Sequence, residues 1–93
     1  MKDRRLERLY ALINIVEAEN QIQVKKWGVQ DRTPFEWLAY TTEELGELAQ
    51  AISEHHYRRG SANNVVKEAT QVATLALKIA EMYLYEGQKT QEG

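Results

Sequence analysis

Acidic residues recur at helical spacing in two separate stretches of the chain. Glu43, Glu44 and Glu47 stand together in the first stretch, and Glu68 and Gln71 repeat the three-residue step in the second. Because a helix turns by about 100° per residue, positions three or four apart lie on one face. Like charges at that spacing repel each other, and a hard divalent cation is the simplest compensation.

The two acidic stretches form one site only if their helices pack together. If the helices run antiparallel, the two pairs face each other across a cleft. Three or four oxygen ligands then converge, with water completing the shell, and Mg²⁺ accepts such a site. The alternative is that these glutamates are ordinary solvated residues, because Glu favours helices and is usually exposed on them.

Aromatic side chains stand in line with the first acidic pair. At helical spacing, Trp37 and Tyr40 share a stripe with Glu44 and Glu47. Two large rings on that line indicate a partly buried wall. This arrangement, together with the second polar pair on an otherwise apolar helix, favours a site over the solvated alternative.

Composition and pattern predict three long helices that position these residues. The chain has one proline and five glycines, and no stretch alternates apolar with polar residues as a strand does. We therefore expect an all-α helical bundle that forms a single domain, residues 1–93. A capping box with proline at the first helical position, Thr33 to Glu36, predicts where the second helix begins.

The helix limits follow from capping residues and glycines. The predicted helices run from Asp3 to Lys26, ended by Gly28; from Pro34 to Arg59, ended by a left-handed Gly60; and from a cap at Ser61 or Asn63 to about Glu86, with a frayed tail from Gly87.

Apolar stripes predict that the bundle is completed by self-association. The third helix is apolar nearly all round, and two other helices can scarcely cover it. We therefore expect a homodimer or a dimer of dimers. The stripes expected to face the core are Leu6, Leu9, Tyr10, Ile13 and Val16; Leu38, Leu45, Leu48, Ala49 and Ile52; and Val65, Ala69, Val72, Ala76, Ile79 and Tyr83.

Charge and composition argue against several classes of protein. A net charge of −2 and a pI of about 5.7 give no electrostatic footprint for nucleic acid or an anionic membrane. The most apolar stretch, residues 72–84, is interrupted by Thr74, Lys78 and Glu81 and is too short to span a bilayer. The lack of cysteine fits the cytosol. We expect a soluble, cytoplasmic protein with neither a membrane nor a nucleic-acid partner.

The acidic pattern resembles the MazG-like family of all-α nucleoside triphosphate pyrophosphohydrolases. That family carries Glu-Glu-x-x-Glu on one helix and, after a spacer, Glu-x-x-Asp on the next. Glu43, Glu44 and Glu47 match the first half, and Glu68 matches the start of the second. The segment before the motif also resembles that of small phage- and Bacillus-type members. The pattern departs at Gln71, where the family has Asp.

The resemblance implies a Mg²⁺ site, with Mn²⁺ as a possible substitute. Glu44, Glu47 and Glu68 would be the ligands, and Gln71 a weaker or water-mediated fourth, because its neutral carbonyl oxygen supplies no charge. Glu43 would support the ligands or orient the attacking water. The implied reaction converts a nucleoside triphosphate to its monophosphate and pyrophosphate.

Other residues are candidates for contact with such a substrate. Trp27, Trp37 and Tyr40 can stack on a nucleobase, or they can be ordinary core or interface aromatics. Arg58, followed by Arg59, can clamp phosphates, or it can complement the negative end of its own helix.

Two functions from different classes therefore remain. The first is a pyrophosphohydrolase that cleans the nucleotide pool. The second is a catalytically silent oligomerisation or nucleotide-binding module that keeps the scaffold, which Gln71 favours.

Overall fold

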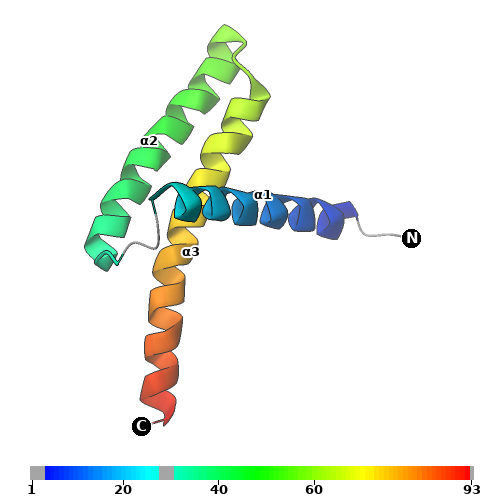
Figure 1. The fold of residues 1–93 in the computed structure, drawn as a ribbon. Coiled ribbons are helices and arrows are strands. Elements are labelled where there is room, and N and C mark those ends of the chain that lie inside the picture. The colour runs from blue at the N-terminus through cyan, green and yellow to red at the C-terminus, as the bar shows by residue number, and fades with distance from the viewer. Residues whose placement is uncertain (1–3, 28–30, 93) are drawn as a thin grey trace.

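Three helices make up the computed structural model, which describes residues 4–27 and 31–92 (Figure 1). They are α1 (Arg4–Trp27), α2 (Pro34–Arg58) and α3 (Ala62–Glu92). No strand occurs within those ranges, so the predicted all-α helical fold is confirmed.

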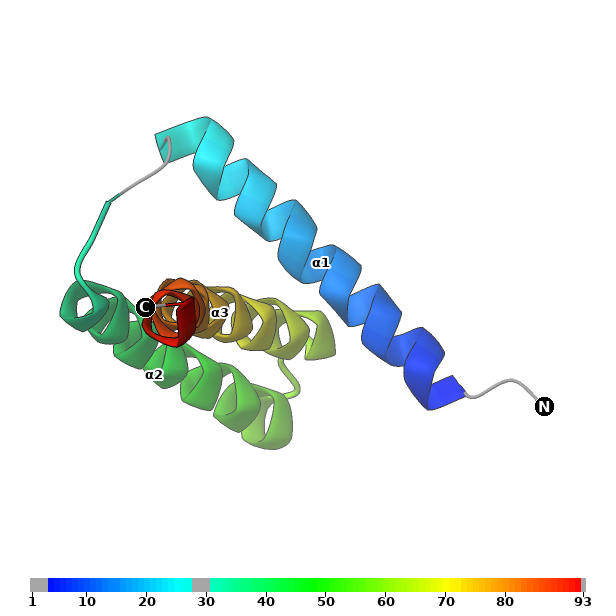
Figure 2. The ribbon, with the colours of Figure 1, turned by 90° about the horizontal axis from the view of Figure 1, so that it is seen from below.

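The helices form an antiparallel hairpin and a crossbar. α2 and α3 lie side by side and are joined by residues 59–61, while α1 crosses α3 near its middle (Figures 1 and 2). In the described part of the chain, α1 packs on α3 and makes no close backbone contact with α2. The hairpin is therefore the element that brings the two acidic stretches together.

The capping box at the start of α2 is confirmed. The Glu36 N–H donates to Thr33 Oγ1 at 3.2 Å, and the Thr33 N–H donates to Glu36 Oε1 at 3.2 Å. Pro34 stands at the first helical position, where a missing N–H leaves no partner unsatisfied. The local sequence thus determines where α2 begins, and with it the helical phase of every residue that follows.

The end of α2 differs from the prediction. The left-handed residue is Arg59, with φ 58° and ψ 33°, and not Gly60. The Gly60 N–H donates to the Glu54 carbonyl at 2.9 Å, and a Cβ on Gly60 would lie 3.2 Å from the Glu54 carbonyl carbon. Glycine is needed here because the chain passes close to the helix end, and not because of its own φ.

The predicted end of α3 is also wrong. Ser61 caps the helix as expected, since the Asn63 N–H donates to Ser61 Oγ at 3.1 Å, but the helix continues beyond Glu86 and Gly87 to Glu92. A glycine inside a helix costs about 1 kcal/mol relative to alanine, and the residues after Gly87 are mostly good helix formers that offset this cost. Two further predicted signals, Asp3 and Gly28, lie outside the described residues.

Only four side chains within the described ranges are buried. They are Ala51, Thr70, Thr74 and Leu75. Two of the four are threonines, and Thr74, only 2% exposed, satisfies its hydroxyl by donating to the Thr70 carbonyl at 2.7 Å. With only two buried apolar side chains, Ala51 and Leu75, the described part of the chain has a smaller hydrophobic core than a domain of this length usually has.

The predicted core stripes are covered only in part, and none of the four buried residues belongs to them. Their partly covered members on α2 and α3 are Leu48, Val65, Val72 and Ile79. On α2, Leu38, Leu45 and Ile52 are each about half exposed. The partly covered line on α2 instead runs through Trp37, Glu44 and the buried Ala51, where a small side chain lets the two backbones approach.

The other two predicted stripes are covered only in part. On α1, Val16 is partly covered while the four large residues before it in the stripe are exposed, and on α3, Ala69, Ala76 and Tyr83 are exposed. Large apolar side chains therefore face outwards on all three helices. Within the described residues, no helix is long and apolar enough to cross a membrane.

Candidate metal centre

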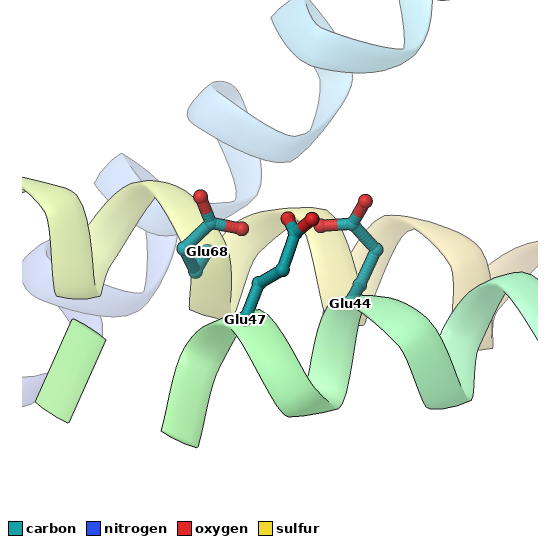
Figure 3. Close-up of side chains that lie close together, drawn as sticks. All are labelled: Glu44, Glu47 and Glu68. Carbon is teal, nitrogen blue, oxygen red and sulfur yellow. The ribbon is translucent and has the colours of Figure 1, made fainter. Parts of the chain in front are cut away.

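Three glutamates from the two arms of the hairpin meet in one place. Glu44 and Glu47 project from α2, one turn apart, and Glu68 projects from α3 towards them (Figure 3). Each offers one carboxylate oxygen, and these oxygens all lie within 4.8 Å of one another. We call these three residues the acidic cluster. The sequence-based expectation that both stretches face each other is thereby met.

Partial burial makes the acidic cluster electrostatically unusual. Glu44 and Glu68 are half-buried, while Glu47 is exposed. Burial, together with the neighbouring charge of Glu47 and hydrogen bonding with Glu68, raises the pKa of Glu44 to about 7. At neutral pH the cluster therefore retains a proton for part of the time, and a cation of higher charge can take the place of that proton.

Gln71 lies against the acidic cluster as a hydrogen-bond donor. With its amide nitrogen turned towards the carboxylates, it donates to Glu44 Oε2 at 2.8 Å and to Glu68 Oε2 at 3.1 Å. The amide thus bridges one carboxylate from each helix. To offer its oxygen to a cation, the same amide must turn over, because its nitrogen cannot act as a ligand.

A cavity of about 410 Å³ adjoins the acidic cluster. Glu44 belongs to both. The remaining lining combines aromatic, cationic and polar side chains from all three helices and the segment before α2: Glu19, Ile22, Gln23, Lys26, Arg32, Trp37, Tyr40 and Leu75. The predicted aromatics Trp37 and Tyr40 are therefore brought to the site.

Arg32 organises the aromatic side of the cavity. Its Nη1 donates to Tyr40 Oη at 3.0 Å, and its guanidinium carbon lies 5.0 Å from the Tyr40 ring centre and 6.0 Å from that of Trp37. The same group pairs with Glu36 at 3.6 Å. The Trp37 and Tyr40 rings meet edge-on at 6.3 Å. This cation and these two rings hold each other in place beside the acidic cluster.

A second cation reaches Trp37 from α3. Lys78 Nζ lies 5.5 Å from the Trp37 ring centre and donates to Asn20 Oδ1 of α1 at 2.6 Å. This contact connects the crossbar helix to the aromatic wall. Sequence reasoning missed Arg32 and Lys78 as neighbours of the site. The available signals were a lysine that interrupts the apolar stretch 72–84 and an arginine placed directly before the capping box.

Two of the predicted site residues, Glu43 and Arg58, are not brought to the cluster. Glu43 is exposed and lies outside the group of converging oxygens. Arg58 is exposed at the far end of α2, roughly 16 Å along the helix axis from Glu47 at 1.5 Å per residue. The side chain of Trp27 lies outside the described residues.

Comparisons with known proteins add no relative. No family model matches the chain, and neither a curated protein nor a solved structure is significantly similar to it.

The raised pKa of Glu44 predicts a pH-dependent stability in the absence of divalent metal. Between the ordinary carboxyl value of 4.5 and about 7, the folded chain holds a proton that the unfolded chain has released. The free energy of unfolding should therefore fall as the pH rises through this window and level off above it. Urea denaturation in EDTA at a series of pH values measures the effect.

Glu44→Gln should remove most of this fall and make the chain more stable than the wild type at pH 8. Glu54→Gln, a change of the same kind at an exposed position of α2, should leave the pH profile unaltered. A wild-type profile that is flat from pH 4.5 to 7.5 would contradict the prediction.

Proposed function

We propose that the chain is a Mg²⁺-dependent nucleoside triphosphate pyrophosphohydrolase. Water and a (deoxy)nucleoside triphosphate would give the monophosphate and pyrophosphate. The observation that carries the proposal is the acidic cluster, whose oxygens from two helices lie within 4.8 Å of one another beside a cavity with aromatic and cationic walls. The resemblance of Glu43, Glu44, Glu47 and Glu68 to the MazG-like motif adds the reaction type.

The donor set of the acidic cluster fits a hard divalent cation. Glu44, Glu47 and Glu68 offer only carboxylate oxygens, which Mg²⁺ prefers, and Mn²⁺ accepts the same ligands. When bound, Mg²⁺ neutralises phosphate oxygens and lowers the pKa of a coordinated water. The half-buried positions of Glu44 and Glu68 reduce competition from bulk water for the site.

The cavity supports a nucleotide as the substrate class. A triphosphate carries about four negative charges and would be repelled by bare carboxylates, so cationic groups must lie along its path. Lys26 and Arg32 line the cavity that Glu44 shares with the acidic cluster. The phosphates would lie towards the cluster and the base against Trp37, in a volume typical of small-molecule sites.

The proposed setting follows from this chemistry. Hydrolysis of canonical or damaged nucleotides serves to clean the nucleotide pool, and its substrates and Mg²⁺ are both cytoplasmic. We therefore propose a cytoplasmic, self-associating enzyme. Stacking on an aromatic ring tolerates any base, so broad base specificity is expected.

Loss of one cluster carboxylate should abolish most of the activity. Purified chain incubated with a panel of nucleoside triphosphates and Mg²⁺ should release pyrophosphate and the corresponding monophosphate. Glu47→Gln and Glu68→Gln should each lower kcat/KM by about 100-fold or more, because even residues that merely support a metal ligand are worth roughly 10- to 100-fold.

Glu54→Gln, at an exposed position of the same helix, should retain full turnover and serves as the matched control. Failure to release pyrophosphate from any nucleotide of the panel at saturating Mg²⁺ would contradict the proposed activity.

The competing proposal is a catalytically silent binding or oligomerisation module. Gln71 favours it, because an amide that bridges Glu44 and Glu68 partly compensates the two carboxylates without a cation. A scaffold that has replaced an acidic ligand with such an amide would keep its shape and its cavity after losing turnover.

Gln71→Asp tests whether Gln71 lies beside the proposed cation. A fourth carboxylate adds charge to the site, so Mg²⁺ affinity measured by calorimetry should rise by about tenfold and turnover should rise with it. Gln71→Leu, which removes the bridging amide but adds no charge, is the matched control and should not tighten Mg²⁺ binding. If Gln71→Asp leaves both Mg²⁺ affinity and turnover unchanged, Gln71 does not contact the cation.

Trp37 should contribute to substrate affinity more than to the chemical step. Loss of a stacked base contact is worth roughly 1–3 kcal/mol, so Trp37→Ala should raise KM by about tenfold or more while kcat changes little. Trp37→Phe should restore most of the affinity. Phe35→Ala removes an aromatic ring that is 82% exposed on the same helix and should leave KM unchanged. A fall in kcat with constant KM would argue against a stacking role.

A further inference from the structure

Within the described residues, one half of α1 and much of the second half of α3 extend beyond the helices packed against them (Figure 1). The N-terminal half of α1 projects past α3, and the C-terminal half of α3 projects past the beginning of α2 (Figure 1). We call residues 4–15 the α1 arm and residues 76–86 the α3 arm. Since the two arms point in different directions, neither can cover the other within one chain (Figures 1 and 2).

The α1 arm is strongly apolar and exposed. Six of its twelve residues are large apolar side chains with exposed fractions between 43% and 62%: Leu6, Leu9, Tyr10, Leu12, Ile13 and Ile15. A lone helix of about twelve residues is only marginally stable in water. The arm continues the packed half of α1, and contact with an apolar partner would stabilise it further as a helix.

The α3 arm presents a second apolar surface of the same kind. Leu77, Tyr83 and Leu84 are 57%, 55% and 60% exposed. Near the start of the arm Lys78 contacts Trp37 of α2 and Asn20 of α1, and beyond that point α3 extends past the beginning of α2 (Figure 1).

The surface area of the whole chain matches what a second copy would cover. A compact protein of 10.8 kDa exposes about 5,540 Å², whereas this chain exposes 7863 Å². Its radius of gyration is 15.9 Å, against about 12.3 Å for a compact chain of this length. The excess of roughly 2,300 Å² per chain corresponds to the large apolar interfaces of obligate homodimers, and far exceeds what a small transient contact covers.

Charge favours pairing between unlike arms. The α1 arm carries three arginines and one glutamate, and its positive charge lies at a helix N-terminus, where the helix dipole disfavours it. The α3 arm carries two glutamates and one lysine, and that lysine, Lys78, is held by Asn20. An α1 arm packed on an α3 arm sets a positively charged helix against a negatively charged one, whereas two α1 arms together would concentrate arginine.

We propose that two copies of the chain associate reciprocally, with the α1 arm of each packed on the α3 arm of the other. The same pair of surfaces then occurs twice about a twofold axis, and the association closes at two copies. The proposal rests on the arms alone and stands whether or not the chain hydrolyses nucleotides.

Light scattering of the full-length chain after size exclusion tests the proposal. The wild type should have twice the chain mass of 10.8 kDa over a wide concentration range. Ile13→Glu places a charge on the apolar side of the α1 arm and should halve the mass. Asn14→Glu adds the same charge to the same arm off that side and should keep the mass of two copies. A wild type with the mass of one chain, or an Ile13→Glu variant that keeps the mass of two, would overturn it.

Cross-linking provides a second test that does not depend on a destabilising variant. The chain has no cysteine, so Leu9→Cys and Leu84→Cys each introduce a single reactive thiol. A flexible bismaleimide should link the mixture of the two variants in at least about twofold greater yield than either variant alone. Equal or greater yield from Leu9→Cys alone would show that α1 arms pair with each other and would overturn the proposed arrangement.

Discussion

The packing of α2 against α3 brings three carboxylates together, and the rest of the site must compensate their mutual repulsion. Where the two helices approach, at Ala51 and Leu75, the hairpin also brings Glu44, Glu47 and Glu68 together. Partial burial of Glu44, together with repulsion from the neighbouring carboxylates of Glu47 and Glu68, raises the pKa of Glu44. A proton and the bridging amide of Gln71 relieve this repulsion, and a divalent cation would relieve it further.

The aromatic wall depends on the same helix phase as the acidic cluster. The capping box at Thr33 sets where α2 begins, so Trp37 and Glu44, seven residues apart, lie along one line of the helix. Arg32, directly before the cap, then folds back over the two rings. A short local signal therefore positions both the cationic edge of the cavity and the carboxylate that it shares with the cluster.

The sequence was sufficient for features that depend on local rules. Helix type, the cap at Thr33 and the shared face of Glu44 and Glu47 follow from periodicity and capping. That Glu68 meets them required in addition the antiparallel packing of α2 and α3, which the sequence analysis could only assume. The rotation of the helices about their axes was not predictable in the same way. The spacing of three residues, Leu38, Leu45 and Ile52, predicts that they face the core, but each is about half exposed. The tight turn at residues 59–61 and the small Ala51 instead present a neighbouring face of α2 to α3. The Lys78–Asn20 contact joins residues far apart in sequence, so no local pattern could reveal it.

Glu44 borders both the acidic cluster and the cavity, and this shared position has a thermodynamic consequence. Any molecule in the cavity that alters the charge or the hydration of this carboxylate must change the affinity of the cluster for a cation. Reciprocity then requires the cation to change the affinity for that molecule by the same factor. A cation in the cluster and a molecule in the cavity would therefore be coupled through a single side chain, and the binding of each would have to be measured with the other's concentration held fixed.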